Sequence, residues 1–128
     1  MAKVEKDLYY TEDHEWIRVE DNTALIGITD FAQEQLGDIV YAEAGDIDIE
    51  LEAGDVVGSV ESVKMASDIY TPVAGKIIAR NEKLEEESEL VNEDPYGSWF
   101  VKIELANPTE LEQLMDAKAY EALVEESD

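Results

Sequence analysis

The segment from Val60 to Tyr70 reads VESVKMASDIY and decides the fold prediction. A β-like run leads into Lys64, and a second apolar stretch leads away from it. The small residues Ala66 and Ser67 lie beside the lysine. Two short β-like runs around a tight reversal predict a hairpin, with Lys64 at its tip and projecting outward.

Lys64 is an isolated positive charge in this part of the chain. It is the only basic residue between Arg18 and Lys76, and the acids Glu61 and Asp68 flank it. A single lysine at a rigid tip is well placed for recognition by a modifying enzyme. An ordinary solvated lysine fits the spacing as well and is the commoner case, because long cationic side chains keep their charge in water.

Other short apolar runs lie on both sides of this hairpin. Turn signals separate them at intervals of about ten residues, which is typical of a β-sandwich or barrel. Asp21-Asn22 supplies one of these turns. The predicted strands cover residues 15–20, 23–28, 39–41, 47–51, 56–63, 75–78 and 99–105.

A short helix and a loop are predicted between these strands. Asp30 and Gln33 have the spacing of a capping box, with Asp30 as the N-cap, and Gly37 stands where a C-terminal cap belongs. Residues 31–36 are therefore expected to be helical. The acidic stretch 82–93 is expected to be a loop, since it runs into turn-forming residues before a proline.

The C-terminal segment 107–126 is predicted to be helical. Asn107 as N-cap and Pro108 at the first helical position are a strong helix start. Apolar residues then follow at helical spacing. Asp116 is the expected point of division into two helical pieces.

The composition fits one folded domain with a large negative charge. The 128 residues are 45% hydrophobic, so we expect a single domain over 1–128, with an N-terminal extension at about 1–8. The 33 acidic residues and nine basic ones give a net charge of −24, which argues against nucleic-acid partners and anionic membranes. The charge fits either docking to a basic partner or adaptation to high salt.

Several kinds of chemistry are excluded by the residues that the sequence lacks. Cysteine is absent, which rules out disulfides, thiolate catalysis and cysteine-based zinc sites, so any redox sulfur must arrive on a cofactor. His14 is the only histidine and is interpreted as a structural residue rather than a ligand or base. The start of the chain lacks the features of a signal peptide, so we expect a cytoplasmic protein. The absence of the usual enzyme constellations favours a carrier or binding module.

Short motifs follow one another in a specific order along most of the chain, from about Tyr10 to Leu123. They are Tyr10-Thr11, His14-Glu15-Trp16, Gly27-Ile28-Thr29-Asp30, Ala32-Gln33, Leu36-Gly37-Asp38-Ile39-Val40, Val60-Glu61-Ser62-Val63-Lys64, Ser67-Asp68, Pro72, Gly75, Asn81-Glu82, Leu90-Val91-Asn92 and Asp94-Pro95-Tyr96-Gly97. Each is weak alone, but the ordered set is highly specific. The chain resembles the lipoyl and biotinyl carrier family, and within it the H proteins of the glycine cleavage system.

The resemblance implies both a fold and a modification site. The fold is mainly β: a flattened, lipoyl-domain-like barrel or sandwich of two antiparallel sheets, with short helices and a helical C-terminal segment. Lys64 would carry lipoate through an amide bond. The residues that would serve its recognition or surround the arm are Glu61, Ser62, Val63 and Asp68.

The resemblance also implies a carrier without catalysis of its own. Its partners would be a pyridoxal-phosphate glycine decarboxylase, a tetrahydrofolate-dependent aminomethyltransferase, a flavin-containing (FAD) dihydrolipoyl dehydrogenase and a lipoate-attaching enzyme. We expect a monomer. Two alternatives remain at this point. Met65 directly after the lysine also occurs in biotinyl domains, and an interaction scaffold would leave Lys64 unmodified.

A loaded lipoyl arm ends in an amine that hydrolysis in water would release, so a carrier benefits from a cleft with a carboxylate at its end. The candidate carboxylates are Glu15, Asp13 and Asp68, and Trp16 is the candidate wall. The alternative is that the acids are solvated and Trp16 belongs to the core.

Overall fold

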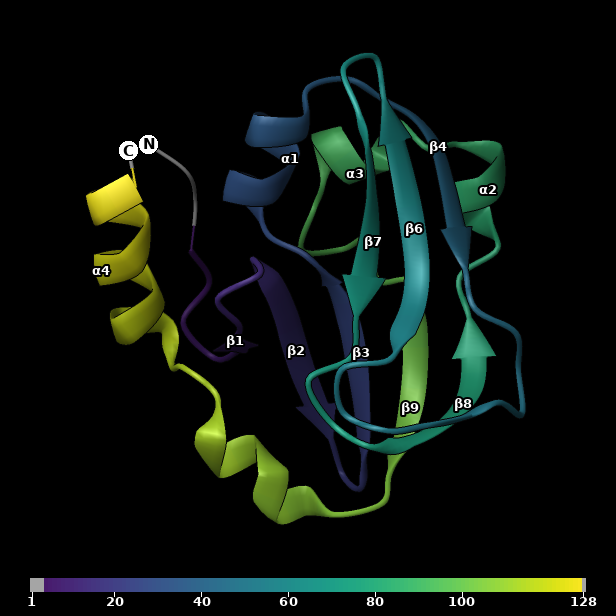
Figure 1. Cartoon of the computed structure of the whole chain (residues 1–128), viewed down its shortest axis with the longest axis vertical. Helices are drawn as coiled ribbons and strands as arrows, with labels where there is room; N and C mark the ends of the chain where they lie inside the picture. Colours follow the sequence, from purple (N-terminus) through teal and green to yellow (C-terminus); the bar gives the residue numbers. More distant parts are fainter. Residues whose placement is uncertain (1–3, 128) are drawn as a thin grey trace.

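Two antiparallel sheets form the body of the protein in this computed structural model, which describes residues 4–127 (Figure 1). The larger sheet has the strand order β1 (Tyr9–Tyr10), β2 (Glu15–Glu20), β3 (Thr23–Ile28), β9 (Val101–Leu105), β8 (Gly75–Arg80) and β5 (Glu50–Leu51). The smaller sheet has the order β4 (Ile39–Ala44), β6 (Val56–Ser62) and β7 (Ala66–Tyr70). This architecture confirms the predicted mainly β fold of two antiparallel sheets.

The main core is filled by apolar side chains from both sheets. Ile26 and Ile103 come from the larger sheet, while Val57, Val60 and Ile69 come from the smaller one, and all belong to one buried cluster. Alternate residues of β9 are buried, as the sequence alternation predicts. Burial of this apolar surface drives the folding of both sheets together.

The hairpin of β6 and β7 has its tip at residues 63–65 (Figure 1). The main-chain N–H of Ser62 donates to the carbonyl of Met65 over 2.7 Å and closes the turn. The Ser62 hydroxyl oxygen accepts from the N–H groups of Lys64 and Met65, at 3.2 and 3.1 Å. Strand β6 therefore ends at Ser62, one residue before the predicted end, and the predicted hairpin with Lys64 at its tip is confirmed.

Helix α1 (Asp30–Leu36) begins one residue earlier than predicted. Thr29, and not Asp30, is the N-cap, because Thr29 is extended and its side chain accepts from the N–H of Ala32. Asp30 already lies inside the helix, where its carboxylate accepts from the Gln33 amide. Gly37 ends the helix with φ 84°, as expected for a C-terminal glycine.

Two other predictions need correction. The predicted strand 47–51 contains only β5, because Asp48 has φ 74° and the left-handed conformation interrupts the extended chain. The predicted loop 82–93 contains two short helices, α2 (Lys83–Glu86) and α3 (Leu90–Glu93). Leu84 and Val91 are buried in the main core and hold these single turns in place.

The C-terminal segment is helical in two pieces, as predicted. The 3₁₀ helix η1 (Pro108–Gln113) has Asn107 as its N-cap, and α4 (Ala117–Ser127) follows. The Asp116 carboxylate accepts from the N–H of Ala119 over 2.8 Å, which explains the division at Asp116.

Helix α4 packs against the N-terminal part of the chain. The rings of Tyr120 and Tyr10 are stacked, with centroids 4.4 Å apart. Leu8 is buried in the same apolar cluster, and Val4 packs against it. Of the predicted extension 1–8, residues 1–3 lie outside the described part of the chain.

Candidate functional site

Lys64 lies in the middle of the hairpin tip at residues 63–65 and is exposed. Its neighbours Val63 and Met65 are apolar but 67% and 53% exposed, so the tip offers both a cation and an apolar surface to solvent. The N–H of Val63 donates to the carbonyl of Asp38 over 3.0 Å, which fastens the tip to the start of β4. A lysine held in this way is accessible from outside and has a fixed backbone.

The acidic side chains near Lys64 lie on the surface of the hairpin and do not form a buried site around the lysine. Glu61 and Asp68 are exposed, on strands β6 and β7 respectively. They line a shallow hollow together with Ser59 and Ser67. Asp68 therefore lies on the open surface of the hairpin and does not join the other candidate carboxylates.

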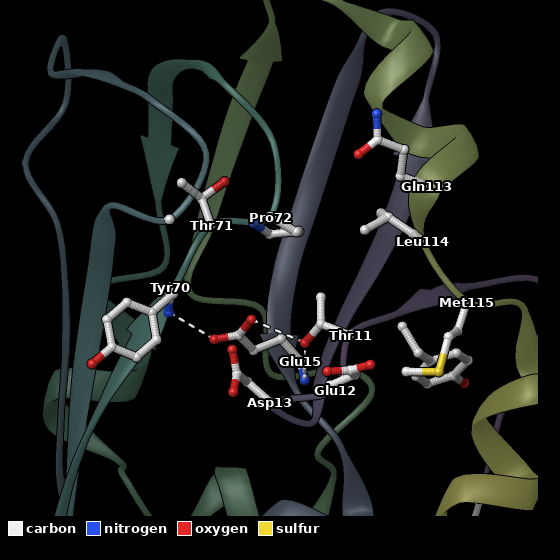
Figure 2. A pocket seen from close by; sticks show the side chains of 12 residues that line it. Thr11, Glu12, Asp13, Glu15, Tyr70, Thr71, Pro72, Gln113, Leu114 and Met115 are labelled. Carbon is white, nitrogen blue, oxygen red and sulfur yellow. Dashed lines mark hydrogen bonds between the residues drawn. The ribbon is translucent and has the colours of Figure 1, made fainter.

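A separate pocket of about 320 Å³ lies at the other end of β7. Three segments line it: residues 10–13 with Glu15, before and at the start of β2, residues 70–72 at the end of β7, and residues 113–115 at the end of η1 and just after it (Figure 2). Gly54 completes the lining. Figure 2 shows the Glu15 carboxylate between the main chain of Tyr70 and the side chain of Thr11.

The Glu15 carboxylate is 3% exposed and has two donors. The N–H of Tyr70 donates to Oε2 over 2.7 Å, and the Thr11 hydroxyl donates to Oε1 over 3.1 Å. Desolvation raises the pKa of Glu15 from 4.5 to about 7, against the lowering effect of these two hydrogen bonds and with a small further rise from Asp13. Glu15 thus changes its protonation state near neutral pH.

The other two candidate residues of the cleft, Asp13 and Trp16, lie in different places: Asp13 lines the pocket and Trp16 is buried. Asp13 lines the pocket and is exposed. Trp16 is fully buried, and its ring nitrogen donates to the carbonyl of Pro95 over 3.0 Å. Trp16 therefore belongs to the core and is not among the residues that line the pocket. The residue of β2 whose side chain lines the pocket is Glu15, which directly precedes Trp16.

His14 has a structural role, as expected. Its Nδ1 lies 2.8 Å from the hydroxyl of Tyr120, and its ring packs 4.6 Å from that of Phe31. Burial lowers the pKa of His14, against a rise from Asp13. The residue has φ 66°, a left-handed conformation at the turn that leads into Glu15.

Sequence reasoning missed the groups that hold the Glu15 carboxylate. The N–H of Tyr70 is a main-chain donor, and it lies 55 residues further along the chain. Nothing in the residue types of these segments signals that they meet. The hydroxyl of Thr11, four residues before Glu15, was the only partner within local reach.

The chain is similar throughout its length to proteins of one family. It matches the family described as Glycine cleavage H-protein over residues 8–127. The glycine cleavage system H protein of Carboxydothermus hydrogenoformans is 53% identical over 127 residues, covering 98% of each chain. That of Marinobacter nauticus is 54% identical over 122 residues, covering 94% of each chain. The crystal structure of a glycine cleavage system H protein from Mycobacterium marinum has a TM-score of 0.84 at 31% identity, covering 91% of this chain and 95% of that one.

The fold gives no sign of a membrane span or a metal centre in the part of the chain that it describes. No helix within residues 4–127 combines the length and apolar character needed to cross a bilayer. No group of three or more acidic or histidine side chains in this range is arranged to hold a metal ion.

The similarities confirm the expected role as a lipoyl carrier in glycine cleavage and do not favour the biotinyl alternative. The chain belongs to the glycine cleavage H-protein family.

Proposed function

We propose that Lys64 carries lipoate in amide linkage and that this arm transports the aminomethyl group in glycine cleavage. The observation that carries the proposal is the exposed Lys64 at the fastened tip of the β6–β7 hairpin. The chain has no cysteine of its own, so its dithiol chemistry needs an attached group. When bound, lipoate supplies a disulfide that takes up the aminomethyl group left after glycine decarboxylation and ends as a dithiol.

The proposed partners are those that membership of the H-protein family implies. A pyridoxal-phosphate glycine decarboxylase loads the carrier, and a tetrahydrofolate-dependent aminomethyltransferase unloads it. A dihydrolipoyl dehydrogenase with FAD restores the disulfide, and a lipoate-attaching enzyme modifies Lys64 beforehand. The exposed surface near the tip, with Glu61 and Asp68, suits partners that present basic docking surfaces.

We further propose that the Glu15 pocket shelters the loaded end of the arm. Lysine with lipoate extends about 15 Å from Cα, and β7 rises by about 13 Å from Ala66 to Tyr70. The arm is anchored two residues before Ala66, so it has the length to follow most of β7 in the direction of the pocket. The amine of its cargo is a cation at neutral pH, and Glu15 would receive it with Asp13 at the exposed side.

The perturbed pKa of Glu15 supports this role. A carboxyl with a pKa of about 7 is half protonated in the empty pocket near neutral pH. A nearby ammonium favours the charged carboxylate, so binding of the cargo would pull the pKa of Glu15 back towards its ordinary range. Glu15 would then gain its charge when the amine arrives.

Intact mass of the protein from its native source tests the attachment directly. The proposal expects a lipoyl adduct, and fragmentation of the adduct should place it on Lys64. A biotin adduct would favour the biotinyl alternative, and a bare chain would favour the unmodified scaffold. Peptide mapping to Lys76 or any other lysine would contradict the proposed site while leaving the carrier role intact.

A further inference from the structure

We propose that Asn92 is a positioning residue that fixes the base of the lipoyl arm, acting through the turn Gly37–Asp38. The inference rests on the proposed modification of Lys64. Asn92 lies on α3, and its side chain forms hydrogen bonds with Gln33, Gly37 and Ile39, none of which belongs to the hairpin. It would act by holding the turn against which the hairpin tip is fastened.

Both the oxygen and the nitrogen of the Asn92 side-chain amide form hydrogen bonds, with groups of α1, its C-terminal cap and the start of β4. Its Oδ1 accepts from the N–H of Ile39 over 2.8 Å. Its Nδ2 donates to the carbonyl of Gly37 over 2.9 Å and to Oε1 of Gln33 over 2.8 Å. The amide thus holds the residues on both sides of Asp38, and only this orientation of its oxygen and nitrogen satisfies all three partners.

Asp38 in turn holds the hairpin. Its carbonyl accepts from the N–H of Val63 over 3.0 Å, one residue before Lys64. The residue that anchors the tip is therefore the one between the two that Asn92 binds. A shift of this turn would move the acceptor of Val63 and, with it, the main chain that bears the arm.

Gly37 provides a second contact, with the stem of Lys64. A Cβ on Gly37 would lie 3.3 Å from Cε of Lys64 and 3.7 Å from its Cδ and Nζ, so the lysine stem passes directly over the bare glycine. Gly37 has φ 84° and ψ −156°, a conformation open almost only to glycine. The stem consequently leaves the hairpin across the C-terminal end of α1, which lies beside the hairpin tip (Figure 1).

The contact of Val63 with Asp38 and the contact of the Lys64 stem with Gly37 together orient the first part of the arm. The main-chain bond to Asp38 fixes the tip, and the surface of Gly37 guides the methylenes. Orientation of a reacting amine contributes strongly to rate, because a misplacement of about 1 Å can cost up to a hundredfold. We therefore expect Asn92 to influence how Lys64 reacts with the lipoate-attaching enzyme, rather than how tightly the enzyme binds.

Two variants and one control test the inference. Asn92→Asp keeps the acceptor for Ile39 but loses both donors, and Asn92→Ala loses all three bonds. Asn22→Ala is the matched control, since Asn22 also joins its side chain to a distant main-chain carbonyl, that of Leu105. We expect kcat for lipoylation to fall about tenfold in both Asn92 variants with KM within about twofold, and no change in Asn22→Ala.

Amide hydrogen exchange supplies a readout independent of lipoylation. In Asn92→Asp the exchange of the Val63 N–H should accelerate more than that of core amides such as Ile103, whereas a purely structural role would accelerate both alike. In the wild-type protein, NMR cross-relaxation should connect the Lys64 side chain with the Gly37 α protons. Absence of that contact, or unchanged kcat with uniform exchange in the variants, overturns the inference. Failure of the wild-type protein to accept lipoate would instead overturn the proposed function.

Discussion

Lys64 and Glu15 depend on opposite environments. Lys64 is exposed, so its contribution is chemical, whereas Glu15 is buried and its environment changes its chemistry. The neighbours of Lys64 supply access and a rigid main chain. The neighbours of Glu15 bury it and supply two hydrogen-bond donors. Substitution of Lys64 should therefore affect its modification, whereas substitution of Glu15 should affect the lifetime of the cargo and the dependence of stability on pH.

Lys64→Arg should abolish lipoylation and carrier activity without harming the fold. Arginine keeps the positive charge, but its guanidinium stays protonated and does not take an acyl group. Because the site is exposed, we expect the free energy of unfolding to change by less than about 0.5 kcal/mol. Mass spectrometry and urea denaturation check the two parts. Retained lipoylation would show that another lysine is modified.

Glu15→Gln should shorten the lifetime of the loaded carrier while leaving lipoylation of Lys64 unchanged. A partly desolvated hydrogen bond between an ammonium and a carboxylate contributes about 1.5–3 kcal/mol, which corresponds to at least a tenfold faster loss of the amine. The rate of ammonia release from the loaded protein measures this loss of the amine. Asp68→Asn is the comparison and should have a smaller effect, because Asp68 lies outside the pocket. Equal rates in wild type and both variants would show that these carboxylates do not shelter the arm.

The same substitution should change how stability depends on pH. Glu15 has a pKa of about 7 in the folded chain and 4.5 as its ordinary value, so between these pH values the folded state binds more protons than the unfolded state. The contribution of Glu15 to the free energy of unfolding therefore falls as pH rises through this range. Glu15→Gln lacks this loss, so its free energy of unfolding relative to wild type should rise by roughly 1–3 kcal/mol between pH 4.5 and 7.

Urea denaturation of both proteins at several pH values measures this difference. The comparison between wild type and Glu15→Gln cancels the titration of the other acids, which are common to both proteins. A constant difference in stability across the range would mean that the pKa of Glu15 is not raised.

At the level of elements, the docking of α4 concerns the site most closely. The Tyr120 hydroxyl lies 2.6 Å from Oγ1 of Thr29 and 2.8 Å from Nδ1 of His14. The Tyr120 hydroxyl thus forms hydrogen bonds with both Thr29 and His14. This chain of hydrogen bonds ties α4 to the N-cap of α1 and to the turn before Glu15.

Tyr120→Phe should destabilise the protein by about 1–2 kcal/mol, because buried partners of the hydroxyl lose a hydrogen bond. The stacking on Tyr10 is retained, so the helix should stay docked. Thermal or urea unfolding measures the cost. Tyr41→Phe is the control: the Tyr41 hydroxyl donates to Glu43 in an exposed pair, and we expect less than about 0.5 kcal/mol. An equal effect of both variants would contradict the structural importance of the Tyr120 network.

At the scale of the whole molecule, the charge of −24 affects association and stability in opposite senses. Attraction to basic surfaces on the partner enzymes weakens when salt screens it, so association should slow as ionic strength rises. Screening also reduces the repulsion among the 33 acids, so the free energy of unfolding should rise with salt. Stopped-flow association and urea denaturation over one salt series test both trends. An association rate independent of salt would contradict electrostatic docking.

Local signals in the sequence predicted most of the strands, the turn at Lys64 and the start of the C-terminal helices. These features depend on alternation, turn residues and caps, which act over a few neighbouring residues. The order of the motifs was sufficient to indicate the family. The short helices α2 and α3 escaped prediction because Leu84 and Val91 hold them by burial in a core that the local sequence does not reveal.

Only the tertiary structure decided which acids share a pocket. Glu15, Asp13 and Asp68 are alike in type, but folding buries Glu15 beside the N–H of Tyr70 and leaves Asp68 on the open hairpin. Trp16 adjoins Glu15 in sequence yet packs in the apolar cluster of Tyr10 and Tyr120, because neighbouring strand residues face opposite sides of a sheet. The sequence predicted most strands and the hairpin turn from local signals, and it pointed to Lys64 as the proposed attachment site through the family resemblance. The raised pKa of Glu15 follows from desolvation, which exists only once distant segments have packed together.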